Sequence, residues 1–384
     1  TRIVLPAQFF FVIGALFTAV QYAKGMFTIP TLAPIIYNLG IIAGGVILNL
    51  GAGTPSPEGF IWGALAGAFA GNFGVQWWGA RRAGMRLPRD AGWSHPALKE
   101  YLTLAIPLMI GQSLVVLDEQ LTRTFGSLVG DGPATHLQYA RRTMLVPVGA
   151  IAQAAGVATY PFLARLFAEG RHRQMAATTA RALRFVLVLS IGAGALLVAL
   201  SVPAVRVLFE RGEFTADDTA AAAAALAVYG FAVAFWGMQQ VMARAFYARR
   251  EMWTPVLIGT AATVLAIPLY WLLQRTWGIR GVALASTIAL GGYTIALGAV
   301  WFRRTGIEHL RPLLGSGLRA LPLAATGALA AWLVAGIFDT LVGGWTGAFL
   351  GLFAAAAAIL ATVFSVGSFL YDWRHSSSHR HLRE

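Results

Sequence analysis

Apolar runs of about 20 residues recur along the whole chain, and this is the length that an α-helix needs to cross a bilayer. The 384 residues are 57% hydrophobic and 12% charged, and the mean hydropathy is +0.66. A soluble domain carries about 25% charged residues. We therefore predict an all-α polytopic membrane protein. Its eleven predicted spans are 3–22, 31–50, 60–79, 101–125, 134–160, 182–202, 217–246, 254–274, 281–301, 318–338 and 345–371.

The basic residues are distributed unevenly between the two sides that these spans define. Of the 29 Lys and Arg, 20 fall in the loops after odd-numbered spans or in the C-terminal tail, and five fall on the opposite side. Short loops rich in Lys and Arg stay in the cytoplasm. The asymmetry therefore predicts a cytoplasmic C-terminus, and the net charge of +13 reflects topology rather than a nucleic-acid partner.

A short pattern occurs twice, six predicted spans apart. It reads QYAKGMFTIP from Gln21 and FYARREMWTP from Phe246, and each copy has a tyrosine eight positions before a proline. An even number of intervening spans gives both copies the same orientation, as in parallel transporter repeats. The pattern predicts two six-helix bundles, the first of them lacking three spans. The alternative is a chance pattern, since aromatic residues gather at span ends.

We expect five segments along the chain on this basis. They are the remainder of an N-terminal bundle (1–79), a basic cytoplasmic loop (80–100), a C-terminal six-helix bundle (101–301), two extra spans (302–371) and a cytoplasmic tail (372–384).

Motifs of enzyme chemistry are absent from the sequence. There is no cysteine and no HExxH, P-loop or GxSxG motif. The tail histidines are explained by a solvated tail, and the outer-loop pair Thr215 and Asp218 has the spacing of a helix capping box. We therefore expect a transporter and not an enzyme, with no cofactor and no metal site.

Two adjacent arginines, Arg141 and Arg142, lie inside the predicted span 134–160. An arginine near the middle of a bilayer costs about 3 kcal/mol and usually faces a cavity or a partner. On a helical wheel, Arg142, Gly149 and Gln153 share a polar or small face, which also holds Val146 and Gly156. Arg141 instead leads an apolar face, so we assign it a supporting role.

A guanidinium inside the membrane suits a phosphate or pyrophosphate group. We therefore predict that Arg142, Gln153, Arg141 and Gly149 form a substrate-binding site. The alternative for Arg142 is a structural ion pair.

The predicted span 101–125 carries the sequence LDEQLTR. Glu119 and Arg123 are four residues apart in the favourable order, which predicts a structural ion pair. Asp118 has no local partner and is therefore a candidate functional acid. Arg244 lies one turn from a cytoplasmic end, where its side chain is expected to snorkel.

Several segments resemble the MurJ (MviN) lipid II flippases of the multidrug/oligosaccharidyl-lipid/polysaccharide exporter superfamily. The segments are FTIPTLAPIIYNLGII, YARRTMLVPVGAIAQAAGVATYPFLARLFAEG, VLFERGEFTADDT and ARAFYARREMWTPV. The family has fourteen spans, and this chain is similar to the fourth through the fourteenth. The resemblance implies translocation of lipid-linked peptidoglycan precursor across the bacterial cytoplasmic membrane by alternating access, with Arg142 matching a central arginine.

The resemblance also bears on energy coupling, because some members bind sodium. Asp118 matches the acid of that site, and Ser286 or Thr287 matches a hydroxyl, with Thr287 our chosen candidate. Ala266 and Tyr270 stand where the family has Asn or Asp. Two oxygen ligands are therefore lost, and we predict no dependence on sodium.

The partners that the resemblance implies are lipid II or a similar polyprenyl-diphosphate glycan, together with membrane lipids. We expect a monomer and no nucleic-acid partner. Two other functions stay open at this point: export of another polyprenyl-linked glycan, and a membrane-embedded glycosyltransferase. The second should show an acid in an extended outer loop, whereas the predicted outer loops are short.

Overall fold

The computed structural model describes residues 3–50, 56–85 and 96–354, and the chain divides into two compact units, Thr1–His95 and Pro96–Glu384. The described residues form helices joined by short turns, with no strand among them. Within that part, six helical segments are long and apolar enough to cross a membrane. The predicted all-α, multi-pass class is confirmed, while the count of eleven spans stays a prediction.

The N-terminal unit consists of three long helical stretches. Helix α1 covers Leu5–Ala23 and α2 covers Thr28–Asn49. The third stretch runs without a break through α3 (Glu58–Gly67), the π-helical η1 (Ala68–Val75) and α4 (Gln76–Arg82). These stretches correspond to the first three predicted spans, with ends that differ by a few residues.

Glycines bring α2 and the third stretch into backbone contact. A Cβ atom on Gly44 would overlap the Cα of Gly63, and one on Gly40 would overlap the Cα of Gly67. Helices in a membrane gain stability from such close approach because there is no water to drive their association. The small residues at this spacing therefore determine how the unit packs.

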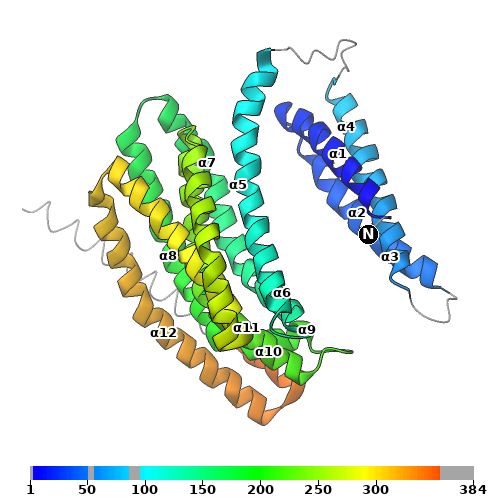
Figure 1. Cartoon of the computed structure of the whole chain (residues 1–384), viewed down its shortest axis with the longest axis vertical. Coiled ribbons are helices and arrows are strands. Elements are labelled where there is room, and N and C mark those ends of the chain that lie inside the picture. The colour runs from blue at the N-terminus through cyan, green and yellow to red at the C-terminus, as the bar shows by residue number, and fades with distance from the viewer. Residues whose placement is uncertain (1–2, 51–55, 86–95, 355–384) are drawn as a thin grey trace, which may run out of the picture. The chain divides into compact units, whose positions relative to one another are not determined.

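The C-terminal unit is built around α10, which covers Ala216–Ala248. It contacts α6 (Pro133–Val148), α7 (Ala154–Ala168), α8 (His172–Ala199), α9 (Ser201–Phe209) and α11 (Trp253–Thr305). The remaining elements are α5 (Pro96–Ser127), the π-helical η2 (Gly149–Gln153), the short η3 (Ile307–His309), α12 (Leu310–Leu341) and a short apolar helix, Gly344–Ala354. Helix α12 lies alongside α8 (Figure 1).

Helix α10 begins with the capping box that the sequence predicts. The Thr215 side chain accepts a hydrogen bond from the backbone of Asp218, and the Asp218 carboxylate accepts one from the backbone N–H of Thr215. Two unpaired donors at the helix start are thereby satisfied. Asp218 is thus part of the helix cap, as the sequence predicts.

Helix α11 is a hairpin of two helices rather than one rod. Gly278 has φ 54° and ψ −130°, a conformation open to glycine, and it separates the predicted spans 254–274 and 281–301. A Cβ atom on Gly281 would overlap the carbonyl of Leu273, so the two halves touch close to the break. The turn between these spans is therefore shorter than the sequence suggests.

Other helices also extend beyond the predicted limits. Helix α5 begins at Pro96, within the predicted loop 80–100, and α7 continues to Ala168. Residues 162–181, which fall between the predicted spans 134–160 and 182–202, are mostly helical because α8 starts at His172. Residues 86–95 and the tail 372–384 lie outside the described residues.

The two copies of the repeated pattern have the same local backbone. The N–H of Gly25 donates to the carbonyl of Tyr22, and the N–H of Arg250 donates to the carbonyl of Tyr247. Gly25 and Arg250 both have positive φ, 71° and 59°. The same hydrogen-bond pattern also ends helices at Gly84 and Gly170. The two copies of the repeat differ from those helix ends because, in each copy, a new helix starts two residues before the proline.

Candidate functional site: a charge-paired cavity in the C-terminal unit

A cavity of about 430 Å³ lies within the C-terminal unit, between α5, α6, α10 and α11. Its polar lining consists of Asp118, Arg141, Trp236, Gln239, Gln240, Arg244, Tyr247, Thr263 and Tyr293. Ionisable side chains inside a membrane protein are costly and usually face such a cavity. The cavity is therefore a candidate functional site.

Asp118 of α5 is the centre of a network that joins three helices. Its Oδ2 atom accepts a hydrogen bond from Nη1 of Arg141 at 2.7 Å. Its Oδ1 atom accepts one from the Tyr270 hydroxyl at 2.9 Å, and the Ser286 hydroxyl lies 3.2 Å from both oxygens. The carboxylate thus receives donors from α6 and from both halves of α11.

The Arg141 side chain is buried at the edge of this network. The residue is 6% exposed, and its guanidinium lies 5.1 Å from the ring centroid of Trp236. An aromatic face attracts a cation, most strongly where water is excluded. A buried charge is tolerated when it is paired and hydrogen-bonded, and Asp118 supplies both.

Arg142 has the opposite environment. The side chain is exposed on the surface of the C-terminal unit, and it has no ion pair or hydrogen bond with any described residue. Val146 is 69% exposed, and a Cβ atom on Gly149 would meet open space. Arg142 and Val146 on α6 and Gly149 at the start of η2 form a continuous exposed stripe.

The sequence assigned the cavity-lining face to Arg142 and a packing or lipid-facing apolar face to Arg141. In the structure, Arg141 lines the cavity of the C-terminal unit, and Arg142 is exposed outside that cavity. Arg141 is the residue that enters a charged cavity, because its partner Asp118 comes from a distant helix. The stripe that contains Arg142 ends before Gly156, which is buried against the Arg244 guanidinium. The π-helical turn η2 lies between them and rotates the later residues out of register.

The other predicted site residues are placed as follows. Glu119 and Arg123 form an ion pair on α5. The Thr287 hydroxyl donates to the carbonyl of Ala283 in its own helix and does not reach Asp118, whereas Ser286 does. The backbone of Gln153 belongs to η2, and its side chain lies outside the described residues.

Arg244 lines the cavity as well as covering Gly156 of α7. The sequence predicts that it snorkels to the cytoplasmic surface, and in the structure its guanidinium lies against Gly156 and lines the cavity. A glycine at position 156 leaves room for the guanidinium, which no larger residue would. The pair Gly156 and Arg244 could not be found from spacing, since the two residues are 88 positions apart.

Sequence reasoning missed most of the aromatic and amide residues of the cavity. Tyr270 was noted as a departure from the family pattern, yet it is fully buried and bound to Asp118 and Thr122. Trp236 and Gln239 gave no signal, because single polar or aromatic residues are common in spans.

These features define an all-helical, multi-pass membrane protein with a charged cavity inside its C-terminal unit. A family model described as "Lipid II flippase MurJ" matches residues 1–369. The chain therefore belongs to the MurJ lipid II flippase family, which is a family of transporters.

Two relatives with similar sequences carry the description "Probable lipid II flippase MurJ". The protein of Rhizobium tropici is 31% identical over 224 residues, 58% of this chain and 40% of the relative. That of Vibrio cholerae is 28% identical over 291 residues, 75% of this chain and 54% of the relative. The "Lipid II flippase MurJ" of Burkholderia cenocepacia is 25% identical over 269 residues, 69% of this chain and 52% of the relative. The chain spans about half the length of the curated relatives it matches.

A solved structure, "Lipid II flippase MurJ, inward closed conformation", is similar in fold. The TM-score is 0.72 with 21% sequence identity, and the match covers 96% of this chain and 75% of the other. The similarity of fold therefore extends through both units.

Proposed function

We propose that this chain moves lipid II, the lipid-linked peptidoglycan precursor, from the inner to the outer leaflet of the bacterial cytoplasmic membrane. The family, whose model matches residues 1–369, supports the proposal. Movement of a large headgroup across a bilayer requires a site that is open to each side in turn, and alternating access between two bundles provides this.

The observation that carries the proposal is the exposed guanidinium of Arg142 on α6. An arginine of a predicted span that has no partner among the described residues is available for an anionic ligand. The planar guanidinium binds phosphate oxygens in pairs, which fits the diphosphate of a polyprenyl-linked glycan. Gly149, seven residues further along the same stripe, leaves open space for a bulky headgroup.

The network around Asp118 supports coupling without sodium. A sodium ion needs several free oxygen ligands, but both carboxylate oxygens already accept hydrogen bonds, and the positive charge beside them belongs to Arg141. The membrane potential supplies about 2.3 kcal/mol per elementary charge per 100 mV. A negative interior drives an anionic headgroup outward, which is the required direction.

The proposal includes the orientation and the oligomeric state. The charge asymmetry supports a cytoplasmic C-terminus. We propose that the protein works as a monomer, because the substrate-binding stripe on α6 belongs to one chain.

The test is complementation of a flippase-depleted bacterial strain by the full-length protein. Arg142→Ala should abolish growth at normal membrane expression, and Arg142→Lys should restore it in part, because an ammonium lacks the paired donors. Arg303→Ala, at an exposed arginine near the end of α11, is the matched control and should grow normally. Normal growth of Arg142→Ala would overturn the proposal.

A further inference from the structure

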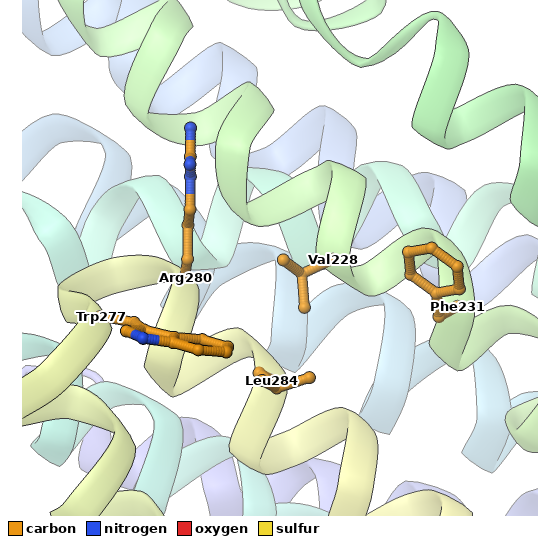
Figure 2. Close-up of a pocket in the computed structure, with 5 residues that line it drawn as sticks. All are labelled: Val228, Phe231, Trp277, Arg280 and Leu284. Carbon is orange, nitrogen blue, oxygen red and sulfur yellow. The ribbon is translucent and has the colours of Figure 1, made fainter.

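A second cavity lies on the surface of the C-terminal unit, between α10 and the turn region of the α11 hairpin. It is a groove of about 500 Å³ lined by Val228 and Phe231 of α10 and by Trp277, Arg280 and Leu284 of α11. Figure 2 shows these five side chains around the opening. Trp277 and Phe231 are 61% and 64% exposed, so large apolar side chains stand open at the surface.

The level of the groove along the helices places it near the boundary of one leaflet. At about 1.5 Å per residue, Trp277 lies about 36 Å along α11 from Trp253, the end that the charge asymmetry puts in the cytoplasm. Phe231 lies about 26 Å from Ala248, at the same end of α10. The hydrocarbon core is about 30 Å thick, so the groove extends from the acyl chains of the outer leaflet to its headgroups.

The charge of the groove is positive. Arg280 is exposed, and it has no ion pair or hydrogen bond with any described residue. The nearby Arg275 differs, because its guanidinium lies 3.8 Å from the ring centroid of Trp271. The five lining residues include no acid. Arg280 is therefore the cation of this groove that is available to an outside anion.

We propose that this groove binds an anionic phospholipid of the outer leaflet. Arg280 pairs with the phosphodiester, and Trp277 lies at the headgroup level, where tryptophan is favoured in membrane proteins. Val228, Phe231 and Leu284 contact an acyl chain. Arg280 and Leu284 follow the Gly278 break, whereas Trp277 directly precedes it, so the groove lies at the turn of the α11 hairpin and against α10.

The experiment uses the purified protein in vesicles that contain lipids brominated on the acyl chain, which quench nearby tryptophan emission. The contribution of Trp277 is the part of the quenching that is present in the parent protein and lost in Trp277→Phe. Brominated phosphatidylglycerol, which is anionic, should quench that contribution at least twofold more than brominated phosphatidylcholine, which is neutral. Equal quenching by the two lipids would show ordinary boundary lipid and would overturn the proposal.

Two further variants connect the preference to the groove. Arg280→Gln should abolish the preference for the anionic lipid, and Arg275→Gln, the matched control, should keep it. Val228→Phe should reduce quenching by both lipids because it fills the groove. Survival of the preference in Arg280→Gln, or unchanged quenching in Val228→Phe, would overturn the assignment. Each of these residues except Val228 is exposed or at the surface, so a melting curve suffices to show that the variants fold.

Discussion

The guanidinium of Arg141 and the carboxylate of Asp118 are 2.7 Å apart and tie α6 to α5 inside the C-terminal unit. The Arg141 side chain is 8% exposed, whereas the Asp118 side chain is 25% exposed, so an unpaired charge on the arginine would be the less well solvated of the two. Removal of one partner from a buried pair leaves an uncompensated charge. We therefore expect the loss of one partner to lower the stability of the protein by more than the net attraction of the intact pair contributes to it.

We expect Asp118→Asn and Arg141→Met each to destabilise the protein by about 2–3 kcal/mol. The double variant should be less destabilised than the sum of the two, because it leaves no unpaired charge. Thermal unfolding of the four proteins in one detergent gives the double-mutant cycle. Additive losses would mean that the two side chains are independent.

Transport should be unaffected when sodium is replaced by choline at a fixed membrane potential. The hydrogen bonds from Arg141, Tyr270 and Ser286 to Asp118 leave no carboxylate oxygen free for the ion. Arg141→Gln removes the resident positive charge. Sodium should therefore raise the melting temperature of this variant and not that of the parent protein. A large loss of parental activity in choline would refute the prediction.

Arg250→Gly should stabilise the protein by about 0.5–1 kcal/mol. Arg250 has φ 59°, and it is the one non-glycine residue with positive φ in the part of the chain that the structure describes. A side chain in this region is strained, and Gly25 occupies the corresponding position of the first copy. Arg250→Ala keeps the strain while removing the charge, so it should give no gain. Melting temperatures of the three proteins decide between strain and charge.

Gly44→Ala should destabilise the N-terminal unit by about 1–3 kcal/mol. The new methyl group would overlap the backbone of Gly63, which cannot move without separating the helices. Gly74→Ala is the control, because its Cβ atom would stand 3.5 Å from the Phe69 carbonyl, an ordinary contact. Similar melting temperatures for both variants would show that the close approach is dispensable.

The orientation can be tested with single cysteines, because the chain contains none. Arg173→Cys lies at the start of α8, on the predicted cytoplasmic side, and Glu213→Cys lies on the predicted outer side. An impermeant thiol reagent should label position 213 in intact cells and position 173 after permeabilisation. Labelling of position 173 in intact cells would reverse the topology.

Hydropathy and charge predicted the helical class well, because both depend on residues close together in the sequence. The predicted boundaries at 254–274 and 281–301 coincide with the two halves of α11, although a single glycine replaces the expected loop. The cavity was harder to predict. Asp118 has no partner within a helical turn, and the residues that bind it come from positions 141, 270 and 286.

The helical wheel is accurate along α6 and fails beyond it, for a definite reason. It assumes 3.6 residues per turn throughout, whereas η2 inserts a wider turn after Pro147. The wheel is accurate for Arg142, Val146 and Gly149, which are exposed together, and it is wrong for Gly156 beyond the wide turn. No pattern in the sequence revealed that turn.

The break at Gly278 divides α11 into two helical arms that are joined through a single non-helical residue. Tyr270 lies on the first arm and Ser286 on the second, and both hydrogen-bond to the same carboxylate of Asp118. Any movement that spreads the arms must therefore detach at least one hydroxyl, and any change at the carboxylate is felt by both arms at once. The Asp118 side chain of α5 thus couples the two arms of the α11 hairpin.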